Sequence, residues 1–175
     1  LASARAGNVI GGGDWSKDRL IPDLVKATKK GNHTIIRSPD AIRPWQHVLE
    51  PLTGYLLLGQ ELLQGKKQFA DAWNFGPKEN EFLSVQDILI LSQKHWNEIK
   101  IEVNNNTHLH EAKILKLNSE KANLVLKWNS IWSINEAIEK TISWYKEYYI
   151  SNIISSDTQL YEYVGKAKSL KYSWT

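Results

Sequence analysis

The sequence contains no cysteine and no methionine among its 175 residues. Without cysteine, neither disulfide bonds nor thiolate metal ligands are possible. Long apolar runs are also missing, because the longest, around residues 55–58, falls far short of the ~20 residues that span a bilayer. The first residues, 1–5, do not resemble a signal or transit peptide. We therefore expect a cytoplasmic protein with no membrane partner.

A strong excess of charge of one sign is missing as well. The formal net charge is only +3, and side chains of both signs are mixed along the chain. Nucleic-acid binders usually gather their basic residues on one face, so we expect no nucleic-acid partner. Hydrophobic residues make up 42% of the chain, which is ordinary for a globular protein and, at this length, provides the core of one domain.

Motifs of catalysis and of metal binding are missing too. The sequence has no Gly-x-Ser-x-Gly elbow, no tyrosine followed four positions later by lysine, and no His-Glu-x-x-His pattern. The segment 108–111 has two histidines and a glutamate, but their spacing does not match a usual metal site. The residues alone therefore indicate binding groups, with no catalytic residue and no metal site.

Strand and helix patterns alternate along the chain. Pro22 suits the first turn of a helix, and Ser84 and Ser133 suit helix N-caps. The alternation favours an α/β or α+β domain over residues 1–150, and residues 151–175 show no clear period and form a C-terminal extension. The pattern predicts strands over 3–10, 33–37, 69–75 and 100–103, and helices over 20–30, 48–64, 85–96, 118–126 and 134–148.

The start of the chain resembles the interior of a domain. Residues 4–10 have the small, apolar character of the end of a buried strand, and a glycine loop follows them directly. A domain seldom begins at the end of its own strand, and the chain has no initiator methionine. We therefore expect the chain to be a fragment of a longer protein.

The glycine loop is a candidate ligand site. Gly11, Gly12 and Gly13 follow the first strand, and ligands of open α/β sheets bind beyond the carboxyl ends of strands. A glycine-rich turn without a ligand explains the triplet equally well, and its spacing matches neither the dinucleotide fingerprint nor a P-loop. Arg19 and Arg43 are candidate anion binders because a guanidinium pairs with phosphate oxygens, although each alone also fits a surface salt bridge.

Six blocks of sequence keep a shared order over residues 1–148: ARAGNVIGGGDW (4–15), DRLIPD (18–23), IRPWQHVLEP (42–51), AWNFGP (72–77), HEA (110–112) and WY (144–145). Together they resemble the extended short-chain dehydrogenase/reductase family, in its NAD-dependent epimerase/dehydratase group, and are closest to the CDP-glucose 4,6-dehydratase branch. The resemblance implies an α/β fold. The expected fold is the C-terminal part of an extended Rossmann-type enzyme, with the late Rossmann strands and a small mixed α/β substrate-binding domain.

The resemblance also implies a set of nucleotide-sugar-binding residues. Asn8 is similar to a residue that contacts the sugar or its diphosphate, Arg19 to one that meets the diphosphate, and Arg43 to one that binds phosphate or ribose. The three residues after Arg19 line the nucleotide groove, and Asn74 lies in a late Rossmann strand. His47 is expected only to tie its loop to the following helix. The full set, which ends with two residues of a nucleotide-contacting segment, is Asn8, Arg19, Leu20, Ile21, Pro22, Arg43, Asn74, His110 and Glu111.

In this family, bound NAD takes a hydride from C4 of the sugar, water leaves across C5 and C6, and the hydride returns to C6. The Tyr–Lys and Asp–Glu pairs that serve these steps, and the NAD-binding turn, lie upstream of Leu1 in the family. No catalytic residue is therefore assigned here, and the cofactor-binding residues are unknown. The resemblance implies the nucleotide-sugar-binding portion of an NAD-dependent dehydratase, inactive by itself and homo-oligomeric when intact.

Two alternatives remain open at this point. One is another sugar-nucleotide epimerase or dehydratase with the same groove. The other is a truncated, non-catalytic module that binds a nucleotide sugar or serves in dimerisation.

Overall fold

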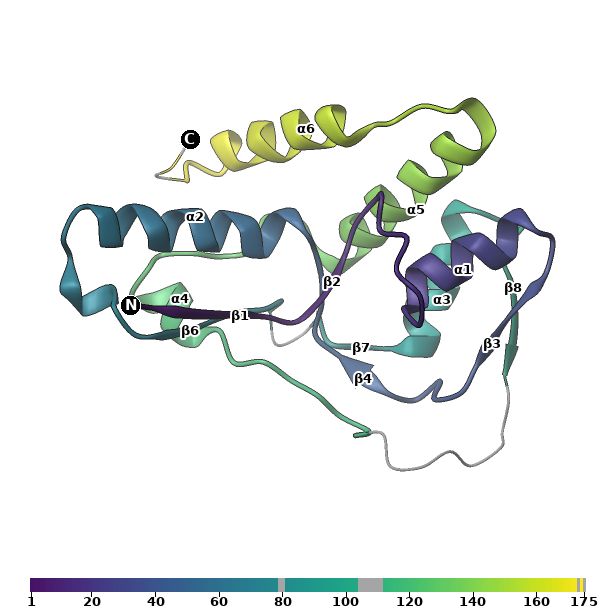
Figure 1. The fold of residues 1–175 in the computed structure, drawn as a ribbon, viewed down its shortest axis with the longest axis horizontal. Helices are drawn as coiled ribbons and strands as arrows, with labels where there is room; N and C mark the ends of the chain where they lie inside the picture. Colours follow the sequence, from purple (N-terminus) through teal and green to yellow (C-terminus); the bar gives the residue numbers. More distant parts are fainter. Residues whose placement is uncertain (79–80, 104–111, 173, 175) are drawn as a thin grey trace.

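The structure is a computed structural model that describes residues 1–78, 81–103, 112–172 and 174 (Figure 1). Helices and strands alternate along the chain, as the sequence predicts. In chain order the elements are β1 (Ser3–Ala6), β2 (Asn8–Ile10), α1 (Leu20–Lys29), β3 (His33–Ile36), β4 (Ile42–Arg43), β5 (Trp45–His47), α2 (Leu49–Leu63), the 3-10 helix η1 (Lys67–Phe69), β6 (Ala72–Phe75), β7 (Leu83–Ser84), α3 (Val85–His95), β8 (Lys100–Val103), α4 (Glu120–Leu124), α5 (Ile134–Ser151) and α6 (Ser156–Ser169).

The described strands pair two by two. β1 pairs with β6, β2 with β5 and β3 with β8, all in parallel, and β4 pairs antiparallel with β7. Parallel partners need a crossover between them, which is usually helical. Helices lie between the partners of each parallel pair in the chain, and the fold is α/β.

Gly7 divides the first strand in two, which corrects the prediction of one strand over residues 3–10. A Cβ on Gly7 would lie 2.3 Å from the carbonyl oxygen of Pro44, so only glycine allows this approach. The N–H of Asn8 donates to the same oxygen at 2.9 Å. The chain therefore leaves β6 after β1 and joins β5 as β2.

The expectation that β1 is buried is also wrong. Ser3, Ala4 and Arg5 are exposed, because among the described residues β1 pairs only with β6. The partner strand β6 is covered on one face, where Trp73 and Phe75 pack against helix α2 and Trp128. The β1–β6 pair thus has one strand in the core and one at the surface.

Helix α5 organises the largest part of the core. Ile138 and Ile142 on this helix are buried and pack in one cluster with Leu24 of α1, Ile88 of α3 and Ile36 of β3. Figure 1 shows α5 between the α1–α3 side of the molecule and the α2–α6 side. The helix is therefore placed to influence both sides.

The predicted helix starts are confirmed by their capping geometry. The Oγ of Ser84 accepts from the N–H of Asp87 at 3.1 Å, and the Asp87 carboxylate accepts from the N–H of Ser84 at 3.0 Å. Ser133 and Glu136 form the same reciprocal pair at the start of α5. Each pair satisfies two backbone donors that a helix start leaves without partners.

Helix α6 is a correction to the sequence prediction, which assigned no period to residues 151–175. Its buried residues are Gln159, Tyr163 and Ala167, four positions apart. Gln159 is polar and is accommodated because its side-chain amide donates to the carbonyl of Lys140 at 2.8 Å. Only two of the three inward positions are therefore apolar, too few to reveal the helical period.

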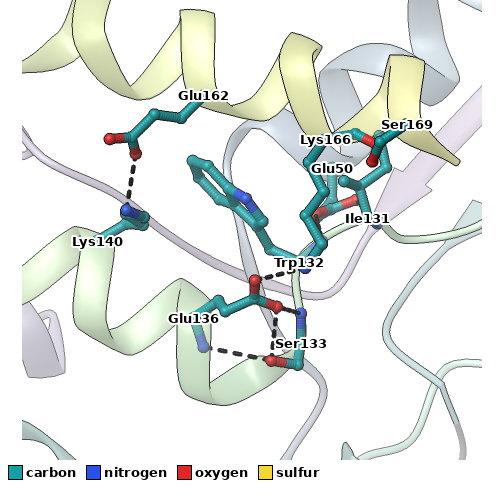
Figure 2. A network of polar contacts seen from close by, with 9 residues as sticks. All are labelled: Glu50, Ile131, Trp132, Ser133, Glu136, Lys140, Glu162, Lys166 and Ser169. Atoms are coloured by element: carbon teal, nitrogen blue, oxygen red, sulfur yellow. Dashed lines mark hydrogen bonds and ion pairs between the residues drawn. The ribbon is translucent and has the colours of Figure 1, made fainter.

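Glu50 joins α2, α6 and the segment before α5. Its side chain is only 1% exposed, and its carboxylate accepts from the N–H groups of Ile131 at 2.9 Å and Trp132 at 2.8 Å, and from the hydroxyl of Tyr163 at 2.9 Å. Burial raises the pKa of Glu50 to about 7, although these three donors and the charge of Lys166 oppose the shift. Figure 2 shows Glu50 beside Ile131 and Trp132, beneath α6.

Candidate functional site

A groove with a volume of about 960 Å³ carries most of the predicted residues. It begins where β2 ends and α1 starts, and it continues along β3 and past Arg43 and Trp45 of β4 and β5. The carboxyl end of β2 and the glycine loop that follows therefore open onto a concave surface. This is the position where ligands bind in open α/β sheets.

Most of the predicted binding residues meet in this groove. They come from three separate places in the chain, namely β2, the start of α1 and β4. The residues that line the groove are Asn8, Arg19, Leu20, Ile21, Pro22 and Arg43.

The remaining predicted residues are not placed there. Asn74 lies on β6, outside the groove lining, and its side-chain amide donates to the carbonyl of Asn118 at 3.1 Å. This hydrogen bond ties β6 to the segment before α4. His110 and Glu111 lie outside the residues that the structure describes.

Side chains of both signs line the groove. Arg19 is 62% exposed at its side chain, and its Nε lies 3.9 Å from the carboxylate of Asp14. Burial would raise the pKa of Asp14, but a hydrogen bond from the N–H of Ser16 and the charges of Arg19 and Lys26 lower it. The Asp14 carboxylate is therefore ionised at neutral pH and can orient Arg19. The charged lining comprises Lys17, Arg19, Arg37, Arg43, Asp14, Asp18 and Asp23.

Arg43 is buried as well as groove-lining. It is 8% exposed, and its Nη1 donates to the carbonyls of Ile42 at 2.9 Å and Ala112 at 2.8 Å. The guanidinium thus links β4 to the chain that follows residue 111, and it adds positive charge to the groove wall. Its contribution is both structural and electrostatic.

Two polar atoms in the groove wall were not predicted as ligand groups. Thr34 and Trp45 are 8% and 6% exposed, and the Oγ1 of Thr34 and the Nε1 of Trp45 have no hydrogen-bond partner among the described residues. Buried polar groups are nearly always satisfied, so these two atoms, which are enclosed in the wall, are exceptions that the surrounding packing leaves. Nothing in the local pattern signals them, since Thr34 follows the alternation of β3 and Trp45 looks like a core residue.

Two further cations of the groove, Lys17 and Arg37, were also missed. Arg37 directly follows β3, at the carboxyl end of a strand, which is a usual position for ligand contacts. Lys17 lies in the loop between the glycines and α1. The position of Arg37 at a strand end was a signal that could have identified it, whereas Lys17 has no such signal.

His47 has the tethering position expected of it. The Nδ1 of His47 accepts a hydrogen bond from the N–H of Leu49 at 3.3 Å. The N–H of Val48, the residue between them, donates to the carbonyl of Ile10. Burial lowers the pKa of His47 to about 3, so the imidazole is neutral. The residue thereby connects β5 and β2 to the start of α2.

Residues 1–78, 81–103, 112–172 and 174 contain neither a metal cluster nor a membrane-spanning helix. No group of three or more His, Cys, Asp or Glu side chains is arranged to hold a metal ion. No described helix combines the length and apolar character that crossing a membrane requires.

No family model matches the chain. A CDP-glucose 4,6-dehydratase of Salmonella typhimurium is 41% identical over 168 residues, which cover 94% of this chain and 47% of that protein. The chain therefore spans about half the length of the curated relative that it matches.

Solved structures show the same fold at lower identity. A UDP-glucuronic acid 4-epimerase from Bacillus cereus aligns with a TM-score of 0.68 at 19% identity, over 82% of this chain and 44% of its own. An epimerase from Methanothermobacter thermautotrophicus aligns with a TM-score of 0.72 at 19% identity, over 83% and 43%. Along 94% of its own length the chain is thus a homologue of a CDP-glucose 4,6-dehydratase, and its α/β fold matches somewhat less than half of the solved epimerase structures.

Proposed function

We propose that this chain is the nucleotide-sugar-binding portion of an NAD-dependent CDP-glucose 4,6-dehydratase, whose intact form converts CDP-glucose to CDP-4-keto-6-deoxyglucose. The observation that carries the proposal is the convergence of six predicted binding residues, from three separate elements, on one groove. The 41% identity to a CDP-glucose 4,6-dehydratase supports the choice of substrate.

The groove has the chemistry that a nucleoside diphosphate sugar requires. Arg19, Lys17 and Arg37 line it and supply positive charge for the diphosphate, for which guanidinium groups make strong paired hydrogen bonds. Asn8 and Ser38 also line the groove and are partly exposed, and they offer an amide and a hydroxyl for the base or a sugar hydroxyl. Charge thus supplies affinity, and the uncharged polar side chains of the lining supply selectivity.

The described residues do not fit NAD. The glycine loop is separated from α1 by residues 14–19, whereas a dinucleotide turn places its glycines at the helix start. The proposal assigns NAD binding, and the catalytic residues, to the remainder of a longer protein, and gives this chain the role of holding the substrate.

The surface of β1 supports the existence of that remainder. Parallel sheets are normally covered on both faces, yet β1 is exposed along Ser3, Ala4 and Arg5. Helices packed on the faces of a larger sheet would bury these residues. Homo-oligomerisation of the intact protein remains part of this proposal.

Substrate selectivity tests the proposal directly. We expect the full-length protein that carries this chain to bind CDP-glucose at least about tenfold more tightly than dTDP-glucose or UDP-glucose, a difference of about 1.4 kcal/mol. Isothermal titration calorimetry with the three nucleotide sugars measures it. Equal affinities would indicate another sugar-nucleotide epimerase or dehydratase, and no binding of any of the three would reject the groove as a nucleotide-sugar site.

Turnover provides a second test. Because no catalytic residue is assigned to this chain, we expect the 175-residue chain expressed alone to release no water from CDP-glucose in the presence of NAD. The full-length protein should do so. Mass spectrometry of the sugar nucleotide follows the loss of one water, and product formation by the chain alone would show that it contains its own catalytic groups.

A further inference from the structure

The loop between β2 and α1 determines where much of the groove's charge lies. Asp14, Lys17, Asp18 and Arg19 all line the groove from this loop. The side chain of Arg19 is mostly exposed, and its contact with Asp14 is long, at 3.9 Å. The position of these charges therefore depends on what holds the loop backbone.

The indole of Trp144, on α5, packs directly on the loop backbone. A Cβ on Gly12 would lie 2.1 Å from the indole Cγ, and one on Gly13 would lie 3.6 Å from the far edge of the ring. Trp144 is buried, and its Nε1 donates to the Oγ of Ser156 at 2.9 Å. The first residue of α6 thus holds the indole against the glycines.

The neighbouring Tyr145 holds the same loop by a hydrogen bond. Its hydroxyl donates to the carbonyl of Asp14 at 2.7 Å, across 131 positions of sequence. Burial raises the pKa of Tyr145, although the backbone of Asp14 opposes the shift, so the hydroxyl keeps the proton that it donates. The ring also meets the indole of Trp15 edge-on, with centroids 5.4 Å apart.

A second anchor comes from α1. The Nζ of Lys26 donates to the carbonyls of Trp15 at 2.7 Å and Ser16 at 3.2 Å. The segment 14–16 is therefore held from α5 on one side and from α1 on the other. No described residue of α5 lines the groove itself, so α5 acts on the groove through this loop and through core residues such as Trp45 and Ile36, which pack in its cluster and line the groove.

We propose that Trp144 and Tyr145 are positioning residues for the groove, which hold the loop so that Arg19 and Lys17 are set for the diphosphate of the substrate before it binds. This inference rests on the proposed nucleotide-sugar function. Ordering a free loop opposes binding, because each fixed backbone residue costs conformational entropy. A loop that is already ordered avoids that cost, and the link through Ser156 extends the same support to α6.

Replacing Tyr145 by phenylalanine in the full-length protein tests the inference, since the ring remains and only the hydrogen bond to Asp14 is lost. We expect the Kd and the KM for CDP-glucose to rise about three- to tenfold, the loss of one neutral hydrogen bond, with kcat unchanged. Amide exchange in residues 11–19 should become faster. The matched control is Tyr148→Phe. Tyr148 also contacts Trp15, but its hydroxyl has no hydrogen bond among the described residues. The Kd of this variant for CDP-glucose should therefore stay unchanged.

A second variant covers the case in which Tyr145→Phe does not fold. Lys26→Met removes the other anchor from a partly exposed position and should also raise the Kd with kcat unchanged. If the wild-type protein binds CDP-glucose and both anchor variants bind it equally well, the positioning role is wrong. A fall in kcat at unchanged KM would overturn it too. If the wild-type protein binds no nucleotide sugar, the proposed function itself fails, and the two failures are thereby distinguished.

Discussion

Replacing Glu50 by alanine is expected to lower the free energy of unfolding by about 3–5 kcal/mol. The carboxylate accepts the N–H groups of Ile131 and Trp132 and the hydroxyl of Tyr163, and each buried donor left without a partner costs about 1–3 kcal/mol. The Tyr163 hydroxyl keeps a second contact with Thr53 at 3.3 Å, so the two backbone donors carry most of the loss. Urea denaturation measures the change, and amide exchange at residues 131 and 132 should accelerate.

The loss of unfolding free energy in Glu50→Ala should also depend on pH. Because the pKa of Glu50 is raised to about 7 in the folded protein, the folded state binds its proton more tightly than the unfolded state does. The wild-type protein therefore gains stability from this group at low pH and loses it as pH rises from about 4.5 through about 7, by roughly 3 kcal/mol. The Glu50→Ala variant should lack this pH dependence of the free energy of unfolding. The stability that it loses relative to the wild type should therefore be larger at pH 5 than at pH 8.

Glu162→Ala is the matched control for the Glu50 variant. Glu162 is on α6 in the same network (Figure 2), with an ion pair to Lys140 at 2.7 Å and a side chain that is 48% exposed. Exposed ion pairs contribute roughly 0–1 kcal/mol, so this variant should unfold almost as the wild type does. Equal and small losses in both variants would show that Glu50 does not hold α6 to α2.

Replacing Arg43 by alanine is expected to weaken the binding of CDP-glucose to the full-length protein by about 1.5–3 kcal/mol, the scale of a hydrogen bond to a charged group. The guanidinium lines the groove and also donates to the carbonyls of Ile42 and Ala112. The variant therefore removes positive charge from the groove and support from its wall. Calorimetry of CDP-glucose binding measures the affinity, and thermal unfolding measures the structural part.

Arg43→Lys separates these two contributions. Lysine keeps the charge but not the planar fork of donors, so it should restore part of the affinity and little of the bonding to Ala112. Binding that stays unchanged in Arg43→Ala would show that Arg43 serves the fold alone.

Much of the local structure could be predicted because its signals are local. Ser84 and Ser133 each lie three positions from the acidic partner of their capping pair, and Pro22 lies in the first turn of its helix. Such signals depend on neighbours within one turn. Helix α6 was missed because its inward position at Gln159 is polar and is satisfied by Lys140 of another helix.

The candidate site was predictable only in part. The ordered blocks of sequence led to Asn8, Arg19 and Arg43, which the fold brings into one groove. They did not reveal Thr34 or Trp45, because whether a buried polar atom has a partner depends on the surrounding packing.

The sequence by itself determined the alternation of helices and strands, the helix starts, the glycine loop and the kinship to the nucleotide-sugar dehydratases. Only the tertiary structure decided that the first strand changes partner at Gly7, that Glu50 joins α2 to α6, and that Trp144 and Tyr145 hold the glycine loop. The physical reason is distance along the chain. Capping and periodicity act over a few residues, whereas these contacts join residues that are tens to more than a hundred positions apart and depend on the packing of the whole core.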